Sequence, residues 1–114
     1  MLSLAHPAVH ISSFVKDRNV AEIFTIKEFS ETLTGKKFWT LDILHGFIKD
    51  KNFLKSANRD RKILIDLLHI EEVQEISFRR NILSVRVSSS EKWNEVLPQI
   101  DEIMKEYQIK LRYR

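Results

Sequence analysis

Apolar and polar residues alternate along two neighbouring stretches in the second half of the chain. In the first stretch Gln74, Ile76 and Phe78 share one face, and in the second stretch Leu83, Val85 and Val87 do so. A period of two residues is that of a strand with one buried face. Arg80 and Asn81 lie between the stretches and suit a two-residue turn, because asparagine tolerates a positive φ angle. The pattern predicts a β-hairpin.

A longer apolar stripe with helical spacing follows this hairpin. Its members are Trp93, Val96, Leu97, Ile100, Ile103, Met104 and Tyr107. Residues 88–90 are all serine and supply candidates for the N-cap, with Ser88 and Glu91 at the spacing of a capping box. Pro98 cannot donate a hydrogen bond to the carbonyl of Asn94, so we expect the helix to kink there or to begin close to it.

A second helix and a last strand complete the second half. Asn58 can cap a helix that runs to about His69, and the imidazole of His69 is then placed to interact with the last carbonyls of that helix. The apolar face of this helix holds Ile63, Leu64, Leu67 and Leu68. In the final stretch Ile109, Leu111 and Tyr113 alternate with Lys110, Arg112 and Arg114, which predicts a half-buried strand with a basic outer face.

The first half has weaker patterns. Residues 1–19 show no periodicity and are expected to be an irregular segment. Residues 21–29 and 36–43 are rich in β-branched and aromatic side chains and predict two strands, with Gly35 in a hairpin connection between them. Residues 44–54 have apolar positions at helical spacing and predict a short helix.

The resulting element order is ββ(α)αββαβ, in which hairpins alternate with helices. This order predicts an α+β fold: one two-layer sandwich, with a mostly antiparallel sheet covered on one face by two main helices. The other face of the sheet is left to water or to a partner. The chain has 114 residues, of which 43% are hydrophobic, so residues 20–114 are expected to form a single domain with its own core.

Composition excludes several kinds of chemistry. The chain has no cysteine, so it supplies no disulfide, thiol nucleophile or cysteine ligand for zinc or an iron–sulfur cluster. His6 and His10 are four residues apart, but Pro7 argues against a helix through them and no third ligand is near. With two glycines and no nucleophile motif, we expect no enzyme, no cofactor and no metal site.

The chain is also expected to act outside membranes. No apolar run approaches the roughly 18 residues of a membrane span, and the first residues lack the basic region of a secretory signal. A cytoplasmic protein is the default interpretation, with an organelle matrix as the alternative.

Charge is the most informative feature for partners. There are 19 Lys and Arg against 16 Asp and Glu, and residues 49–62 are net basic whereas residues 91–106 are net acidic. A basic surface is predicted on the uncovered sheet face or its edges, and its candidate partner-binding residues are Arg79, Arg80, Arg86, Lys110, Arg112, Arg114, Lys36 and Lys37. Such a surface suits an acidic protein or RNA. Alternatively, these side chains are solvated positions that protect strand edges from aggregation.

Two aromatic residues lie among the lysines of this set. Phe38 and Trp39 follow Lys36 and Lys37, so one of the two rings is expected to face outward, where it would stack on a base or anchor a protein partner. At least one of the rings is expected in the core, and Trp93 is assigned to the core as well.

Three segments resemble one known family. Residues 67–73 (LLHIEEV) are similar to a helix-ending L-F-x-I-E-G-V motif, the hairpin at 76–87 follows, and residues 93–100 (WNEVLPQI) resemble W-x-x-L/V-x-P-x-I. Together, residues 61–107 resemble the N-terminal domain of the Nfu/NifU-like iron–sulfur scaffold proteins, with a weaker likeness from residue 21. An early Thr-Pro-Asn-Pro-Asn signature is absent, and Glu72 stands where the family has a glycine that favours left-handed backbone.

The resemblance implies a function without cluster ligands. Full scaffolds carry a separate Cys-x-x-Cys domain that holds the cluster, and this chain has no cysteine. The resemblance therefore implies a non-enzymatic protein-interaction domain, accessory to iron–sulfur cluster assembly, that docks to assembly or recipient proteins. A small basic RNA-binding module is the alternative hypothesis.

Overall fold

The fold is described from a computed structural model, which describes residues 10–25, 27–55 and 58–113. Its elements are, in chain order, β1 (His10–Asp17), β2 (Val20–Phe24), α1 (Glu31–Thr34), α2 (Leu41–Ile48), α3 (Lys51–Lys55), α4 (Arg59–Leu68), β3 (Val73–Arg79), β4 (Ile82–Val87), the 3₁₀ turn η1 (Ser90–Lys92), α5 (Trp93–Glu106) and β5 (Ile109–Tyr113).

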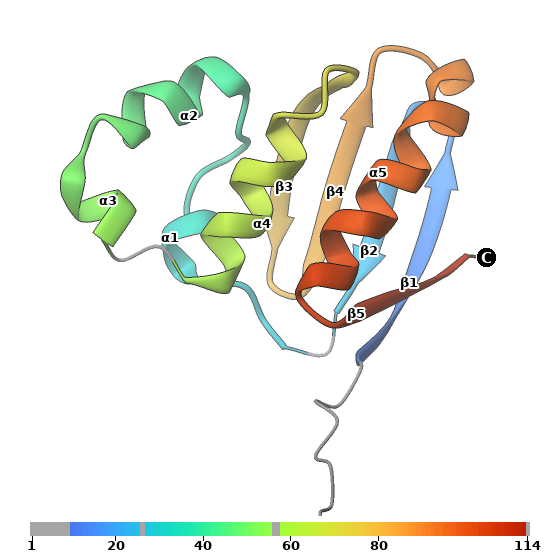
Figure 1. The fold of residues 1–114 in the computed structure, drawn as a ribbon, viewed down its shortest axis with the longest axis horizontal. Helices are drawn as coiled ribbons and strands as arrows, with labels where there is room; N and C mark the ends of the chain where they lie inside the picture. Colours follow the sequence, from blue (N-terminus) through green and yellow to red (C-terminus); the bar gives the residue numbers. More distant parts are fainter. Residues whose placement is uncertain (1–9, 26, 56–57, 114) are drawn as a thin grey trace, which may run out of the picture.

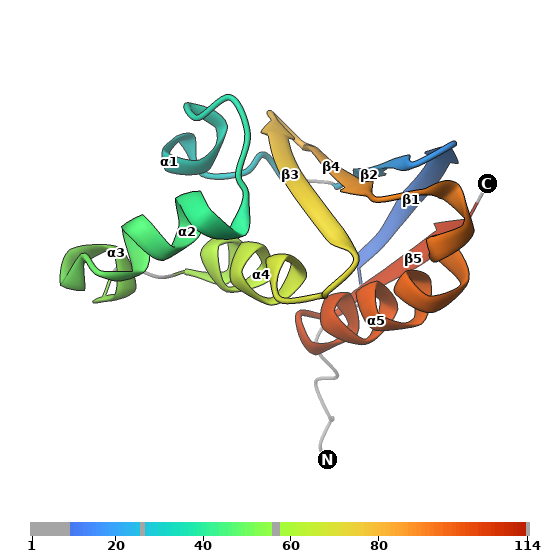
Figure 2. The ribbon, with the colours of Figure 1, turned by 90° about the horizontal axis from the view of Figure 1, so that it is seen from above.

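The five strands form one sheet in the order β3-β4-β2-β1-β5 (Figure 1). Neighbouring strands are antiparallel except β1 and β5, which are parallel. Figure 2 shows α4 and α5 on the same side of this sheet, and the small helices α1 to α3 beyond β3. The predicted α+β sandwich, with a mostly antiparallel sheet and two main helices on one face, is confirmed.

The core lies between the sheet and the two main helices. From Ile76 to Val87 the inward residues alternate with outward ones as the sequence pattern requires, and Trp93 of α5 is 2% exposed as expected. Gln74, expected on the inner face, is exposed, because an irregularity in the register between Val73 and Glu75 places Val73 in the core instead. The core side chains of the long elements include Ile76, Phe78, Leu83, Val85, Ile63, Leu64, Leu67, Leu68, Val96, Ile100 and Met104.

The expectation that residues 1–19 are irregular is wrong for residues 10–17, which form β1. This strand pairs with β2 on one side and β5 on the other. Its core face carries Ser12 as well as Phe14, and both are buried. A serine at a buried position removes the apolar alternation by which a half-buried strand is detected.

The predicted strand at residues 36–43 is also wrong. Thr40 caps α2 instead, since its hydroxyl oxygen accepts a hydrogen bond from the Ile43 N–H at 3.3 Å. Trp39 forms only an isolated bridge to Ile76. The hairpin partner of β2 is β1, and Arg18, with φ 58°, lies in the turn that joins them.

The predicted helices are confirmed with changed boundaries. The side chain of Asn58 accepts from the Arg61 N–H at 3.2 Å and caps α4, and Nδ1 of His69 lies 2.7 Å from the Ile65 carbonyl oxygen, as expected for a helix end. The single helix expected at 44–54 is two helices, α2 and α3. Asp50 lies between them and accepts from the Asn52 N–H at 2.8 Å.

The longest helix differs from expectation at its start. It runs without interruption from Trp93 through Pro98 to Glu106. The predicted Ser88–Glu91 capping box is not formed. The N-cap residue of η1 is Ser89 instead of Ser88, and its side chain makes no capping hydrogen bond. None of the helices in the described part of the chain is long and apolar enough to cross a bilayer.

Candidate functional site

The candidate site is the face of the sheet that α4 and α5 leave uncovered. Side chains alternate along each strand, so the residues between the core positions point to this side. The strand registers place them in rows across the sheet. We call this surface the open face, and its residues are Ser13, Val15 and Asp17 of β1, Val20, Glu22 and Phe24 of β2, Glu75, Ser77 and Arg79 of β3, Ile82, Ser84 and Arg86 of β4, and Lys110 and Arg112 of β5.

The open face has an apolar centre of two pairs. Phe24 of β2 lies directly opposite Ile82 of β4, and both are half-buried. Val15 and Val20 are diagonal neighbours on β1 and β2, and Val15 is 38% exposed. Apolar side chains on an uncovered sheet face are partly in contact with water, so covering them would be favourable at about 25 cal/mol per Å² buried.

Two shallow hollows cross the open face and meet at Val20. One has a volume of about 310 Å³ and is lined by Val15, Asp17, Arg18, Asn19, Val20 and Glu22. The other, of about 200 Å³, is lined by Val20, Glu75, Ser77, Ser84 and Arg86. Val20 lines both hollows, and their other lining residues lie on β1 to β4 and in the β1–β2 turn.

Two ion pairs lie on the open face. Nη2 of Arg79 lies 3.4 Å from Oε2 of Glu22, and Nε of Arg86 lies 3.8 Å from Oε2 of Glu75. These side chains are partly solvated, so each pair contributes little to the free energy of unfolding. With Asp17, the open face carries three acidic side chains against four basic ones. Its charge is therefore nearly balanced.

The basic residues predicted to bind a partner do not form one patch. Arg79 and Arg86 are on β3 and β4, whereas Lys110 and Arg112 are on β5, at the other edge of the sheet. Arg79 and Arg112 belong to one row across five strands. Four strand spacings separate them, or about 19 Å.

The remaining predicted residues lie outside the strands. Arg80 is in the β3–β4 turn with φ 54°, so the positive φ angle falls on it and not on Asn81. Lys36 and Lys37 follow α1, beyond β3, and Nζ of Lys36 is 5.2 Å from the centre of the Phe47 ring. Arg114 lies outside the described residues.

The two aromatic residues beside these lysines divide as expected. Trp39 is fully buried, and its Nε1–H donates to the Leu33 carbonyl at 3.2 Å. Phe38 is 37% exposed. It lies in the segment that precedes α2, next to the bridge between Trp39 and Ile76 at the β3 edge.

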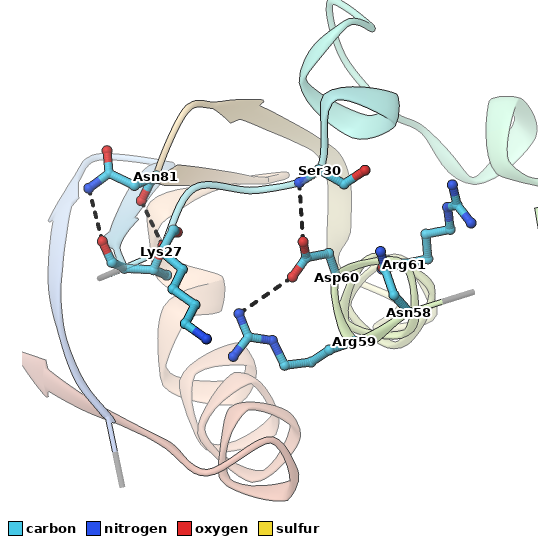
Figure 3. Close-up of polar contacts among 8 residues, drawn as sticks. Lys27, Ser30, Asn58, Arg59, Asp60, Arg61 and Asn81 are labelled. Atoms are coloured by element: carbon cyan, nitrogen blue, oxygen red, sulfur yellow. Dashed lines mark hydrogen bonds and ion pairs between the residues drawn. The ribbon is translucent and has the colours of Figure 1, made fainter. Parts of the chain in front are cut away.

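The contacts that fix the β3–β4 turn were not predicted from the sequence (Figure 3). Nδ2 of Asn81 donates to the Thr25 carbonyl at 2.9 Å, and the single proton of the Thr25 hydroxyl is within reach of two carbonyl oxygens, that of Lys27 at 2.7 Å and that of Asn81 at 3.1 Å. Further along the same segment, the Ser30 N–H donates to Oδ2 of Asp60, 3.1 Å away on α4. The turn that follows Arg79 is thereby tied to β2. An asparagine after a strand is typical of a turn, but it does not reveal its partner.

The helix side of the molecule has a groove of its own. It has a volume of about 550 Å³, lies between α4 and α5, and is lined in part by Asp66, His69 and Glu102. The Tyr107 hydroxyl donates to Oδ2 of Asp66 at 2.8 Å. Burial, together with this hydrogen bond and the charge of Asp66, raises the pKa of Tyr107 to about 12.

The described residues contain no group of three or more His, Cys, Asp or Glu side chains that could hold a metal ion. His6 lies outside the described residues, and His10 is the first residue of β1.

Comparisons with protein-family models, with curated proteins and with solved structures give no match to this chain.

Proposed function

We propose that this chain is a non-enzymatic protein-interaction domain that docks a folded partner through its open face. The observation that carries the proposal is the apolar centre of that face, Val15, Val20, Phe24 and Ile82, which the molecule's own helices leave uncovered. A hydrophobic centre surrounded by polar and charged side chains is the usual composition of a protein–protein interface.

The distribution of charge favours a protein over RNA. An RNA-binding face gains most of its affinity from unpaired lysines and arginines that contact phosphates. On the open face Arg79 and Arg86 already lie beside Glu22 and Glu75, and the other two bases are at the far edge. On this face the described strands also carry a single aromatic side chain on which an RNA base could stack, that of Phe24.

The sequence resemblance to Nfu/NifU-like scaffolds suggests the biological setting. We propose that the partner is a protein of iron–sulfur cluster assembly or a recipient of clusters, and that this chain binds it without ligating the cluster. One departure from the family pattern proves to be tolerated: Glu72 is not among the residues with positive φ angles, which in the described chain are Arg18, Arg80 and Gln108. The connection from α4 to β3 therefore needs no glycine at this position.

The test measures binding of the purified chain to purified cluster-scaffold and recipient proteins by biolayer interferometry. Val15→Glu places a charge in the apolar centre, and Leu41→Glu is the matched control, since Leu41 is 37% exposed on α2, away from the open face. We expect Val15→Glu to weaken binding at least tenfold, about 1.4 kcal/mol, and Leu41→Glu to leave it unchanged.

Two results would contradict the proposal. The first is that Val15→Glu binds the partner as well as Leu41→Glu does, or that the unaltered chain and both variants bind none of the partners. The second is tight binding of a single-stranded RNA at about 50 mM salt that weakens steeply as salt is raised, because that dependence is the signature of phosphate contacts.

A further inference from the structure

The two edges of the sheet differ in how their backbone is covered. At the β3 edge, the N–H groups of Trp39 and Ile76 each donate to the other residue's carbonyl, at 2.6 and 2.8 Å. The Phe29 N–H donates to the Arg80 carbonyl at 2.7 Å beyond the same strand. The segment that carries α1 therefore blocks this edge against a further strand.

The β5 edge is uncovered in the described part of the chain. β5 pairs with β1 on one side, and no described strand lies on its other side (Figures 1 and 2). In a parallel pair, alternate residues of a strand direct their N–H and C=O groups away from the partner. Such an edge is a template for another strand.

A groove of about 640 Å³ runs along this edge between α5 and β5. Asp101 and Lys105 line it from α5, and Ile109, Lys110, Leu111 and Tyr113 line it from β5, with Gln108 between the two elements. The Tyr113 side chain is about half exposed, and its ring lies edge-on to Phe14 at 5.2 Å. The apolar surface on the helix side of β5 is therefore mainly the Tyr113 ring, since Ile109 and Leu111 are each only 4% exposed.

The side of β5 that belongs to the open face is basic, and Lys110 also borders the groove. Lys110 and Arg112 alternate with the inward residues and are exposed. An added strand would place every second side chain beside these two cations and the intervening side chains against the groove.

We propose that the β5 edge binds an extended segment of another protein as a sixth strand, with acidic side chains beside Lys110 and Arg112 and apolar side chains toward the groove. Backbone hydrogen bonds to β5 supply affinity, and the alternation of acidic and apolar residues supplies specificity. The β5 edge shares Lys110 and Arg112 with the open face, but it uses backbone groups of β5 and not the apolar centre, so strand addition does not depend on the docking of a folded partner.

Charge argues against a second copy of this chain as the occupant. If two β5 strands paired antiparallel about Leu111, Lys110 of each would lie opposite Arg112 of the other. Like charges directly opposite each other are destabilising, so pairing of two β5 strands is disfavoured and pairing of β5 with an acidic strand is favoured. The alternative, that these cations only protect the edge from aggregation, predicts that no peptide binds.

The test uses the whole chain, labelled with ¹⁵N, and three synthetic peptides. EVEVEVE alternates glutamate and valine, KVKVKVK reverses its charge, and EVEPEVE removes one central N–H donor. We expect saturable binding of EVEVEVE, with the largest changes in amide chemical shift and the slowest hydrogen exchange in β5. The other two peptides are expected to bind at least tenfold more weakly.

Charge reversal on the protein completes the test. We expect Lys110→Glu with Arg112→Glu to exchange the preference, so that KVKVKVK binds at least tenfold better than EVEVEVE, which also shows that this variant is folded. Lys49→Glu with Lys51→Glu is the matched control, with the same change of charge at exposed residues remote from β5, and is expected to keep the original preference. Ile82→Glu, which alters the apolar centre three strands away from β5, is expected to leave peptide binding intact, which separates the β5 edge from that centre.

Three results would overturn the proposal: no saturable binding of EVEVEVE up to millimolar concentration, chemical-shift changes centred on β2 and β4 instead of β5, or dimerisation of the unaltered chain through β5 in sedimentation experiments. The last result would identify a second copy as the occupant.

Discussion

Trp39 connects the small helices α1 to α3 to the edge of the sheet, and its replacement by alanine tests how that edge is covered. The side chain is fully buried, and its ring centre lies 5.0 Å from that of Phe47 and 6.2 Å from that of Phe53. Its backbone forms both hydrogen bonds to Ile76. The Trp39 side chain thus packs in the core of this segment, while its backbone holds the segment against the edge of β3.

The cost of Trp39→Ala comes mainly from the cavity. The Leu33 carbonyl that accepts from the indole N–H also accepts from the Gly35 N–H, so losing the indole leaves no unpaired carbonyl. Removing a buried tryptophan ring costs about 3–5 kcal/mol. The free energy of unfolding of a domain is typically about 5–15 kcal/mol, so the loss of the ring would remove about a fifth of it or more.

Stability is measured by urea unfolding monitored by circular dichroism, and local protection is measured by hydrogen exchange at the Ile76 amide. Trp93→Ala is the matched control, since Trp93 is equally buried but its Nε1–H donates to the Arg18 carbonyl at the other end of the sheet. We expect both variants to lose similar stability. Only Trp39→Ala should make the Ile76 amide exchange faster than its strand neighbours.

A loss below about 1 kcal/mol for Trp39→Ala would show that the ring is not part of a close-packed core. Unchanged protection of Ile76 despite a large loss would show that the segment covers the β3 edge without its tryptophan. Either result would refute the assignment of Trp39 as the residue that holds this cover in place.

The second half of the fold was predictable because its elements are amphipathic within themselves. In β3, β4 and α5 the buried residues recur at the period of their own element, and Asn58 and His69 mark the ends of α4 by local hydrogen bonds. These signals depend on residues a few positions apart. They can therefore be recognised without knowledge of the rest of the chain.

The first half depends on partners that are distant in sequence. β1 pairs in parallel with β5, about a hundred positions away, and its buried Ser12 gives no apolar signal. The aromatic content of residues 36–43 favours a strand, but Trp39 is used as a buried anchor and Thr40 starts a helix. In both segments tertiary packing overrides local propensity.

The site was predictable only in part for the same reason. An uncovered sheet face and exposed bases on the predicted strands follow from alternation, and the structure agrees on both. The apolar centre could not be assigned, because Val15 belongs to the unpredicted β1. Strand order is also not local, and it is this order that places Arg79 and Arg112 at opposite edges and leaves β5 uncovered.

Three further outcomes follow from single contacts. Asn58→Ala removes the cap of α4 and should lower the free energy of unfolding by about 1 kcal/mol in urea titrations, whereas Asn58→Ser should restore most of it. Arg79→Ala removes an exposed ion pair with Glu22 and should change that free energy by no more than about 0.5 kcal/mol; a larger loss would mean that the pair is structural. The pKa of Tyr107 is raised from 10.0 to about 12 in the folded state, so between these values the folded chain holds a proton that the unfolded chain has lost. Stability should therefore be complete below pH 10 and fall as the pH rises toward 12. Tyr107→Phe should make this fall shallower and remove the higher transition in absorbance at 295 nm, leaving that of Tyr113, whose pKa is also raised by burial and by Asp101. An unaltered slope in the variant would show that the hydrogen bond to Asp66 does not hold the phenol proton.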